Sequence, residues 1–238
     1  MNLRPLLAIE LSQAGGEVGL RTPDGTDRLR PVAGGGPGRE DPLVPTIDRL
    51  VREAGLAPGD LRAVAVSAGP GGFTGLRIST VATKLLAEAL SIPAIAVPSA
   101  QAVASLAPGD GPVLVALAAK RGTAYLAGFR GRGAATTALG EAATGDVDTF
   151  AALVAACGTV PTLVADRHLP PGIAARAAEL GVAIVEPVHS ARAILALGEA
   201  ALARGERTDP LALGPIYPRE PEAVTIWNAR HGDAGRAT

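Results

Sequence analysis

The stretch VSAGPGGFTGLRIST at residues 66–80 is the strongest indication of how this chain folds. An apolar run precedes it, glycine stands at positions 69, 71, 72 and 75, and apolar residues then recur at helical spacing from Leu76 onward. Glycine gives a backbone the freedom to turn sharply and to approach other groups closely. The pattern predicts a buried strand, a tight glycine-rich loop and a long helix.

On either side of this stretch, apolar runs broken by turn signals predict strands that alternate with helices. Upstream, strands are expected at residues 5–12, 16–21, 28–32 and 61–67, with a helix at about 43–51 that ends before Gly55. Downstream, the helix at about 75–90 leads to a strand at 94–97 and a helix that starts at Ser99. A second pass begins at Pro112 with two strands, at residues 113–118 and 123–129. Strand or helix candidates follow at 147–156, 162–165, 173–180 and 182–185, and a last helix is expected at 191–204.

This order of elements indicates an α/β fold with helices covering sheets. It resembles the two-lobed actin, sugar-kinase and heat-shock ATPase (ASKHA) superfamily, a ribonuclease H-like fold, here with a degenerate second lobe. We expect residues 1–107 to form the first lobe and 108–227 the second, with the helix at 191–204 available to pack back on the first lobe. The tail at 228–238 has no apolar periodicity and is expected to be disordered.

Composition narrows the classes of function. Lysine and arginine total 22 against 23 acidic residues, so the net charge of −1 gives no overall field to attract a nucleic acid. The one cysteine, Cys157, lies in an apolar run, which indicates a small buried side chain and a reducing compartment. No apolar run approaches the roughly 20 residues of a membrane span, so a cytoplasmic protein is expected.

The glycine-rich loop has two interpretations. A helix N-terminus offers unpaired N–H groups to an anion, which favours a phosphate site. The known phosphate fingerprints fail, however. Counted from Gly69, both loop types need a glycine where Thr74 stands, and if Gly75 is taken as the later glycine of a P-loop, Leu76 follows it in place of lysine. On the residues alone, a tight structural turn and a ligand site both stay open.

The helix after the loop has an unusual distribution of side chains. Arg77, Lys84 and Glu88 are spaced by seven and four residues, so they share one narrow polar stripe. The rest of the helix is largely apolar, which is more than a surface helix needs to contact its own domain. The surplus must be covered either by the core of the same chain or by another chain.

Several segments together resemble the TsaB family, the dimerisation subunit of the bacterial machinery for tRNA threonylcarbamoyladenosine. The stretch GPGGFTGLR at 69–77 is similar to the family signature GPGSFTGLR and differs at Gly72. The opening LLAIELS at 6–12 resembles LAIDTS, LLAEALSIPAIAVPS at 85–99 runs parallel to a family segment, and GPIYPRE at 214–220 resembles a P-x-Y-L-R element.

Besides Gly72, and Glu10 and Leu11 in the opening strand, the chain departs from the family pattern at three further places. Asp41 follows Arg39 and Glu40 where the family has histidine, and Pro218 replaces a leucine. In the second lobe, AAKRGTAY at 118–125 replaces a turn that resembles DARxGEVY, so Ala118 and Ala119 stand in place of its acidic start.

The resemblance implies a scaffold that pairs with the catalytic subunit TsaD and works with the ATPase TsaE, contacting tRNA only through the complex. It implies no catalytic residue, no metal and no cofactor bound by this chain alone, with ATP acting at the level of the complex. A homodimer is also expected for the isolated chain. The expected partner interface lies on the signature loop and helix and comprises Gly69, Pro70, Gly71, Phe73, Thr74, Gly75, Leu76, Arg77, Ile78, Val81 and Leu85.

Nucleotide chemistry in this superfamily would want an acidic residue in each lobe to organise Mg²⁺. Glu10, with Ser12 beside it, forms at most a degenerate nucleotide site, because Ala118 and Ala119 provide no second acid. The alternative function is a small ATP-dependent kinase or ATPase using Glu10, Ser12 and the glycine loop, and a third is a homodimeric structural protein. The three histidines, His168, His189 and His231, are interpreted as solvated loop or cap residues rather than ligands.

Overall fold

A computed structural model describes residues 4–13, 15–32, 42–218 and 227 of the chain. Within this part, the chain forms two sheets that follow one another in sequence. The predicted disordered tail and the departure at Asp41 lie outside the described residues. No helix among the described residues is long and apolar enough to cross a membrane.

The first sheet is built around the strand that opens the chain. Its strand order is β3-β2-β1-β4-β5, and β1 pairs antiparallel with β2 but parallel with β4. The strand β4 reads AVAVS and is buried along its whole length, as is typical of a parallel strand covered on both faces. The strands are β1 (Leu6–Glu10), β2 (Glu17–Arg21), β3 (Asp27–Pro31), β4 (Ala63–Ser67) and β5 (Ala94–Val97).

Helices cover both faces of the first sheet. On one face lie α1 (Leu43–Glu53) and α2 (Phe73–Leu90), with the short 3-10 helix η1 (Pro58–Asp60) between them in sequence. The helix α1 is amphipathic, because its buried residues Leu43, Ile47, Leu50 and Val51 recur every three or four positions. The opposite face is covered by α6 (Ala191–Ala203), which contacts β1, β2, β4 and β5.

The second sheet has the order β11-β10-β6-β7-β8, with β9 also paired to β7. Its outer helices are α4 (Val147–Ala156) and α5 (Pro171–Glu179). The short helix α3 (Ser99–Ser105) packs against β6 and β7 from the inner side. The strands are β6 (Val113–Lys120), β7 (Thr123–Arg130), β8 (Thr137–Ala138), β9 (Ala143–Gly145), β10 (Thr162–Ala165) and β11 (Ala183–Val185), and the 3-10 helix η2 (Gly133–Ala135) precedes β8.

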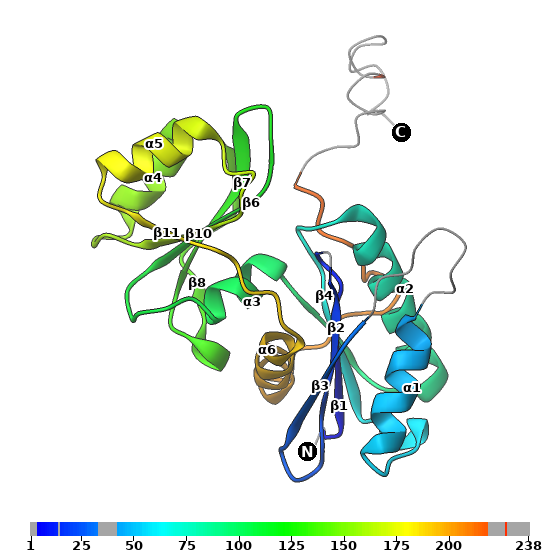
Figure 1. Ribbon diagram of the computed structural model, residues 1–238. Coiled ribbons are helices and arrows are strands. Elements are labelled where there is room, and N and C mark those ends of the chain that lie inside the picture. Colours follow the sequence, from blue (N-terminus) through cyan, green and yellow to red (C-terminus); the bar gives the residue numbers. More distant parts are fainter. Residues whose placement is uncertain (1–3, 14, 33–41, 219–226, 228–238) are drawn as a thin grey trace.

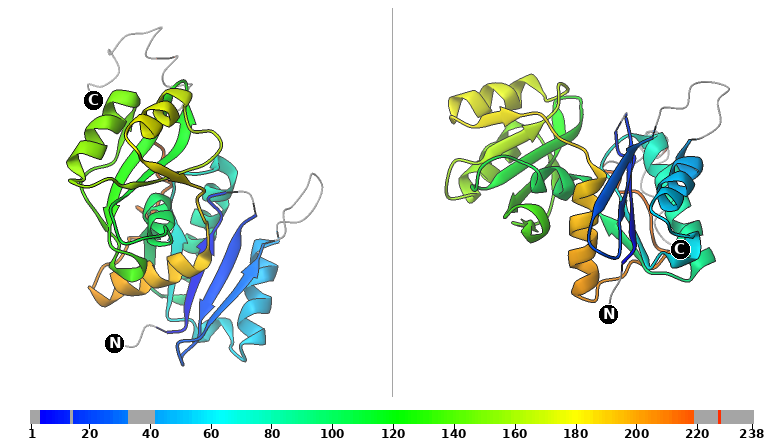
Figure 2. Two further views of the ribbon diagram at one scale, coloured as in Figure 1. Left: turned by 60° about the vertical axis from the view of Figure 1, so that its left-hand side comes forward. Right: turned by 60° about the horizontal axis from the view of Figure 1, so that its bottom comes forward.

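The helices α3 and α6 lie between the two sheets, while α1 and α2 lie outside the first sheet and α4 and α5 outside the second (Figures 1 and 2). The small residues of α3 allow this close packing. Ala102 belongs to the core against the first sheet, whereas Ala100, Val103 and Ala104 belong to the core against the second. How the chain divides into independent lobes stays a prediction, because these two helices contact elements of both passes.

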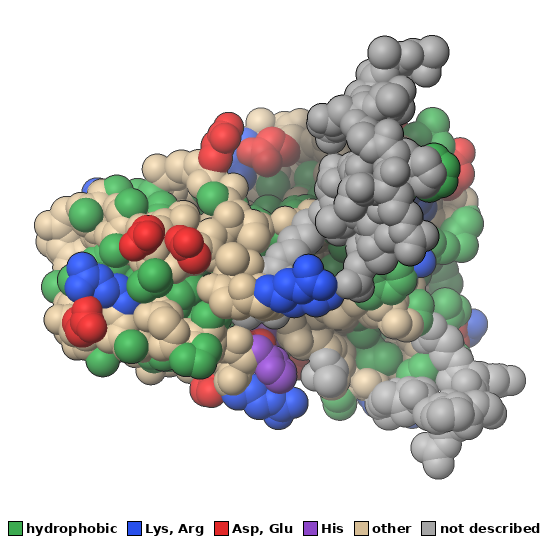
Figure 3. Space-filling view, turned by 90° about the horizontal axis from the view of Figure 1, so that it is seen from above, with side chains coloured by type: hydrophobic (Ala, Val, Ile, Leu, Met, Phe, Trp, Pro, Cys, Tyr) green, Lys and Arg blue, Asp and Glu red, His purple; other side chains and the backbone are tan. Residues whose placement is uncertain are grey.

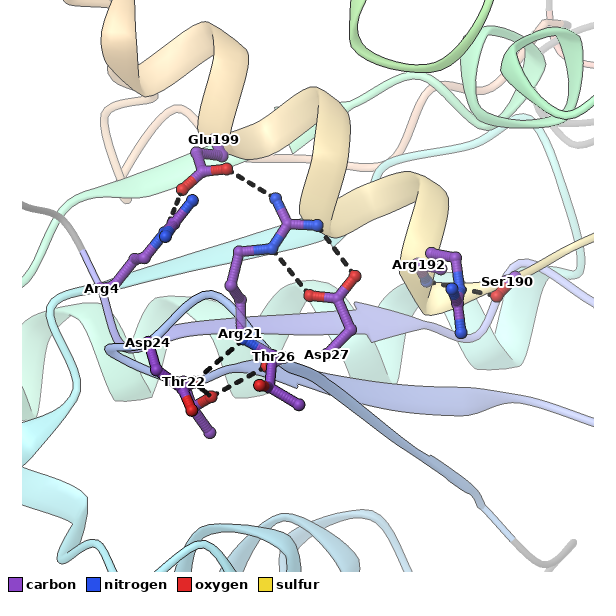
Figure 4. Close-up of polar contacts among 9 residues, drawn as sticks. All are labelled: Arg4, Arg21, Thr22, Asp24, Thr26, Asp27, Ser190, Arg192 and Glu199. Carbon is purple, nitrogen blue, oxygen red and sulfur yellow. Dashed lines mark hydrogen bonds and ion pairs between the residues drawn. The ribbon is translucent and has the colours of Figure 1, made fainter.

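Charged side chains fasten α6 to the first sheet (Figure 4). Glu199 of α6 accepts hydrogen bonds from Nε of Arg4 at 2.5 Å and from Nη1 of Arg21 at 2.6 Å. Arg21 also binds Asp27 through two nitrogens, at 2.7 and 2.9 Å. At the start of the helix, an oxygen of Glu17 accepts hydrogen bonds from the Ser190 hydroxyl and the Ala191 N–H, both at 2.8 Å. This network fixes the position of α6 across the strands.

Most predicted elements are present, with small shifts at their ends. The helix expected from residue 75 begins two residues earlier, at Phe73, because Gly72 is its N-cap and Gly75 already lies in its first turn. The strands β8 and β9 were not predicted, since two or three residues give no measurable period. Cys157 is buried, as predicted, and its burial raises the pKa of the thiol.

Candidate functional site

The glycine-rich loop packs directly on the turn that follows β1. Gly72 donates its N–H to the carbonyl of Ser12 at 2.7 Å, and Gly69 donates to the hydroxyl of Ser99 at 3.0 Å. A Cβ added at Gly71 would lie 2.3 Å from the Ser12 carbonyl oxygen, and one at Gly75 would lie 2.0 Å from that of Leu11. Glycine is required at both positions because backbone atoms occupy the space that a side chain would need.

The C-terminal segment covers the other side of the loop. Ile216 donates its N–H to the Ala68 carbonyl at 2.6 Å, and a Cβ at Gly69 would lie 2.8 Å from the Ile216 carbonyl oxygen. Gly69 has a φ of +105°, a conformation that favours glycine. Because chain atoms contact both sides of the loop and take the N–H groups of Gly69 and Gly72, the loop is a packing element rather than an open phosphate cradle.

Glu10 and Ser12 lie at the carboxyl end of β1, and both are buried. One carboxylate oxygen of Glu10 accepts the N–H of Ser12 at 2.6 Å, while the other has no hydrogen-bond partner among the described residues. The Ser12 hydroxyl lies 3.2 Å from Nδ1 of His189, in the segment that leads into α6. Sequence reasoning missed this contact, which joins residues 177 positions apart.

His189 is therefore a correction to the interpretation of the histidines as solvated residues, whereas His168 is exposed as predicted and His231 lies outside the described residues. Burial lowers the pKa of its ring, and the nearby carboxylates of Glu10 and Asp166 partly oppose that effect. The imidazole is half-buried beside a hollow of about 380 Å³ lined by Gln13, Asp166, Arg167, His168, Glu186, Pro187 and His189. Figure 3 shows this region from above, where histidine side chains are coloured purple, basic ones blue and acidic ones red.

Most residues that line this cleft are polar or charged, but the described ones do not gather there as a metal site. No group of three histidine, cysteine, aspartate or glutamate side chains in the described ranges has the arrangement that would hold a metal ion. A kinase or ATPase of this fold would need free N–H groups in the glycine loop and acids from both lobes. Two of those N–H groups already bind within the chain, so the cleft does not favour the nucleotide alternative.

A second candidate site lies on the outer face of α1 and α2. Four large apolar side chains are exposed there: Val44 at 66%, Phe73 at 53%, Val81 at 54% and Leu85 at 66%. Between the helices lies a hollow of about 400 Å³ whose lining residues are Leu43, Val44, Arg77, Ile78, Val81, Ala82 and Leu85. We call this set, together with Phe73, the α1–α2 surface.

The predicted interface residues divide between this surface and the core. Phe73, Arg77, Val81 and Leu85 are exposed, and Ile78 is partly exposed beside them. Leu76 belongs to the core instead, because it is fully buried and packs against Gly69. The loop residues Gly69 and Pro70 are buried as well, whereas Thr74 is exposed.

The inner face of α2 explains why so many apolar side chains remain outside. Ser79, Thr80 and Thr83 are buried against the first sheet together with Leu76 and Ala87. Short hydroxyl side chains let the helix approach the sheet closely, with the Ser79 hydroxyl bonded to the Leu76 carbonyl at 3.1 Å. The predicted polar stripe of Arg77, Lys84 and Glu88 is therefore only part of the outer face, and apolar residues occupy the rest.

An aromatic and cationic cluster closes one end of the α1–α2 surface. The guanidinium carbon of Arg77 lies 3.6 Å from the centroid of the Phe73 ring. The Phe73 and Tyr217 rings are 5.5 Å apart, and Nε of Arg77 donates to the Tyr217 hydroxyl at 3.3 Å. Tyr217 comes from the C-terminal segment, and its place here was not predicted. The Pro-x-Tyr element at 215–217 was noted in the sequence, but no local pattern connected Tyr217 with α2.

The sequence of this chain matches a known family model and known proteins. The family model for TsaD, described as tRNA N6-adenosine threonylcarbamoyltransferase, matches residues 40–184, more than half of the chain. An uncharacterized protein of Mycobacterium leprae is 30% identical over 225 residues, covering 93% of this chain. The chain spans only 56% of the length of that relative.

A named protein and a solved structure are also similar to this chain. The tRNA threonylcarbamoyladenosine biosynthesis protein TsaB of Bacillus subtilis is 36% identical over 83 residues, which cover 34% of this chain and 36% of that protein. The solved structure of YeaZ from Pseudomonas aeruginosa superposes with a TM-score of 0.70 at 25% identity, covering 89% of this chain and 99% of YeaZ.

The two successive sheets, with helices between and outside them, define a two-lobed α/β protein of the ASKHA type. Its glycine loop is filled by its own chain, and an apolar helix surface faces outward. Within that class, the chain belongs to the TsaB/YeaZ-like branch of the TsaD family.

Proposed function

We propose that this chain is a non-catalytic partner subunit in the biosynthesis of N6-threonylcarbamoyladenosine on tRNA. It pairs with a TsaD-like catalytic subunit through the α1–α2 surface and works with a TsaE-like ATPase, while tRNA is held by the assembled complex. Membership of the TsaB/YeaZ-like branch supports the role in this biosynthesis. The exposed α1–α2 surface is the observation that carries the assignment to pairing.

Large apolar side chains clustered in a hollow are costly to leave in water, and such patches commonly mark protein interfaces. The TsaD family model matches this chain over residues 40–184, so the proposed partner shares its fold over that region. Two related subunits can pair through the same helices in a near-symmetric arrangement, as homodimers do through one self-complementary patch. The same surface therefore also supports self-association when the partner is absent.

The non-catalytic assignment is supported by the state of the two loops that would handle a nucleotide. The glycine loop is packed against Ser12 and Ile216. The second-lobe turn has Ala118 and Ala119 at the positions where the family pattern begins with an acidic residue. The purified chain is therefore expected to show no ATP turnover. ATP hydrolysis that disappears on Glu10→Ala would instead support the kinase alternative.

The pairing is tested by introducing a charge on the exposed apolar surface. Val81→Glu and Leu85→Glu are each expected to weaken association with the TsaD-like subunit about a hundredfold, because a carboxylate would be buried without a partner. Val160→Glu is the matched control, since Val160 is also exposed (62%) but lies just before β10, away from α1 and α2. Association is measured by co-elution and titration calorimetry, and circular dichroism checks the fold. Parent-like binding by both folded variants would place the interface elsewhere.

A further inference from the structure

Arg77 is held in place at the end of the α1–α2 surface. Its guanidinium stacks on the Phe73 ring at 3.6 Å, and its Nε donates to the Tyr217 hydroxyl at 3.3 Å. Stacking on an aromatic ring restricts the side chain and keeps the planar group in one orientation. Tyr217 takes Nε, and within the described ranges neither terminal nitrogen of Arg77 has a hydrogen-bond partner, so both can face an acceptor on another molecule.

The charge of Arg77 is not neutralised within the part of the chain that the structure describes. Several other arginines have a carboxylate partner there, such as Arg21 with Asp27 at 2.7 Å and Arg52 with Asp48 at 2.8 Å. No carboxylate among the described residues lies within ion-pair distance of Arg77, although the side chain is ordered by its two aromatic neighbours. A pre-oriented guanidinium without a counter-ion is suited to a partner molecule that supplies the acid.

We propose that Arg77 binds a carboxylate side chain of the partner subunit, with Phe73 and Tyr217 as its positioning residues. The inference rests on the proposed function, since it assigns specific chemistry to one end of the α1–α2 surface. A planar guanidinium presents two parallel N–H groups that match the two oxygens of a carboxylate. The apolar hollow would then provide most of the contact area, and Arg77 would select an acidic partner residue.

The surroundings of Arg77 favour a protein carboxylate over an RNA phosphate. Among the described residues that line the hollow, Arg77 is the one charged side chain, and its neighbours there are Leu, Val, Ile and Ala. Binding to a phosphate backbone depends on several cations that neutralise successive phosphates. A lone arginine beside a broad apolar surface instead resembles the anchor of a protein interface, where aromatic and arginine residues are enriched.

The test uses the full chain and the purified TsaD-like subunit. Arg77→Glu is expected to weaken association about a hundredfold, because two carboxylates would face each other. Arg77→Lys keeps the charge but loses the planar fork, so about a tenfold loss is expected. Arg192→Glu is the control, since Arg192 is an exposed arginine in the first turn of α6 and should leave association unchanged.

A double-mutant cycle tests the positioning residues. Tyr217→Ala should weaken association several-fold in the parent chain but have little further effect in an Arg77→Gln background. Replacing the acidic partner residue by arginine should restore binding to the Arg77→Glu variant. Independent, additive losses from Tyr217→Ala and Arg77→Gln would overturn the positioning role.

The outcomes separate this inference from the proposed function. If Val81→Glu abolishes association but Arg77→Glu binds like the parent, the carboxylate assignment is wrong and the pairing surface stands. If Arg77→Glu spares pairing but weakens binding of tRNA by the assembled complex, a phosphate is the ligand and the assignment is overturned. Pairing lost with Arg77→Glu and rescued by charge reversal on the partner would establish it.

Discussion

At the scale of single residues, the signature loop is defined by which glycines touch backbone atoms. Gly75 lies in the first turn of α2, where alanine would normally be the better helix former. A Cβ there would lie 2.0 Å from the Leu11 carbonyl oxygen, whereas one at Gly72 would lie 3.6 Å from that of Ser12. The family's serine at position 72 is therefore compatible with this backbone, and the departure at Gly72 does not alter the loop.

These distances predict opposite effects of two neighbouring substitutions. Gly75→Ala should lower the free energy of unfolding by about 2 kcal/mol, since the backbone at Leu11, just after β1, must move away from α2 to admit the methyl group. Gly72→Ser should be neutral or stabilising by a few tenths of a kcal/mol, because serine is a good N-cap residue. Urea unfolding followed by circular dichroism measures both. A Gly75→Ala variant as stable as the parent would contradict the close contact between Leu11 and α2.

At the scale of elements, α6 depends on Glu199 for its charged contacts with the first sheet. Glu199→Gln should lower the free energy of unfolding by about 1 kcal/mol, a modest value because the side chain is 31% exposed. Hydrogen bonds from Arg4 and then Arg21 hold the pKa of Glu199 below its usual range. The carboxylate thus stabilises the fold above the unfolded pKa of about 4.3, and this contribution is lost as the pH falls through the lower folded value.

The comparison of variants across pH isolates that contribution. Parent and Glu199→Gln chains should differ in stability at pH 7. The difference should shrink once the pH falls below about 4, near the pKa of glutamate in the unfolded chain, because the carboxylate then becomes protonated. Glu179→Gln serves as the control, since Glu179 forms a surface pair with Arg176 at 2.7 Å in which both side chains are largely exposed. A difference of equal size for both variants, or one that persists in acid, would show that Glu199 does not anchor α6 electrostatically.

At the scale of the whole molecule, the first sheet relies on a helix that is distant in sequence. Leu6, Ala8 and Ile95 share a core cluster with Ile194 and Leu197 of α6, so a fragment ending at residue 107 would expose that apolar face. We expect residues 1–107 alone to bind a hydrophobic dye and unfold without cooperativity. Co-expression with residues 186–218 should restore cooperative unfolding measured by circular dichroism. A fragment 1–107 that folds by itself would show that the first lobe is independent of α6.

The sequence by itself determined the elements and the signature loop, because both are set by local patterns. Apolar spacing fixes where an element lies, and the strand predicted at 94–97 agrees with β5 without any shift. The bounds of 147–156 and 162–165 agree as well, although only the structure shows that the first is a helix and the second a strand. The glycines at 69–75 likewise identify a turn that needs close backbone approach. The family signature follows from the same short stretch of chain.

The tertiary structure alone decided which of these residues meet and which face outward. The periodicity of α2 does not distinguish its two faces, and only packing shows that Ser79, Thr80 and Thr83 point inward while Val81 and Leu85 remain exposed. The contacts of Ser12 with His189 and of Arg77 with Tyr217 join residues 177 and 140 positions apart. No local period carries such information, because contacts between distant segments depend on how complete helices and sheets pack together.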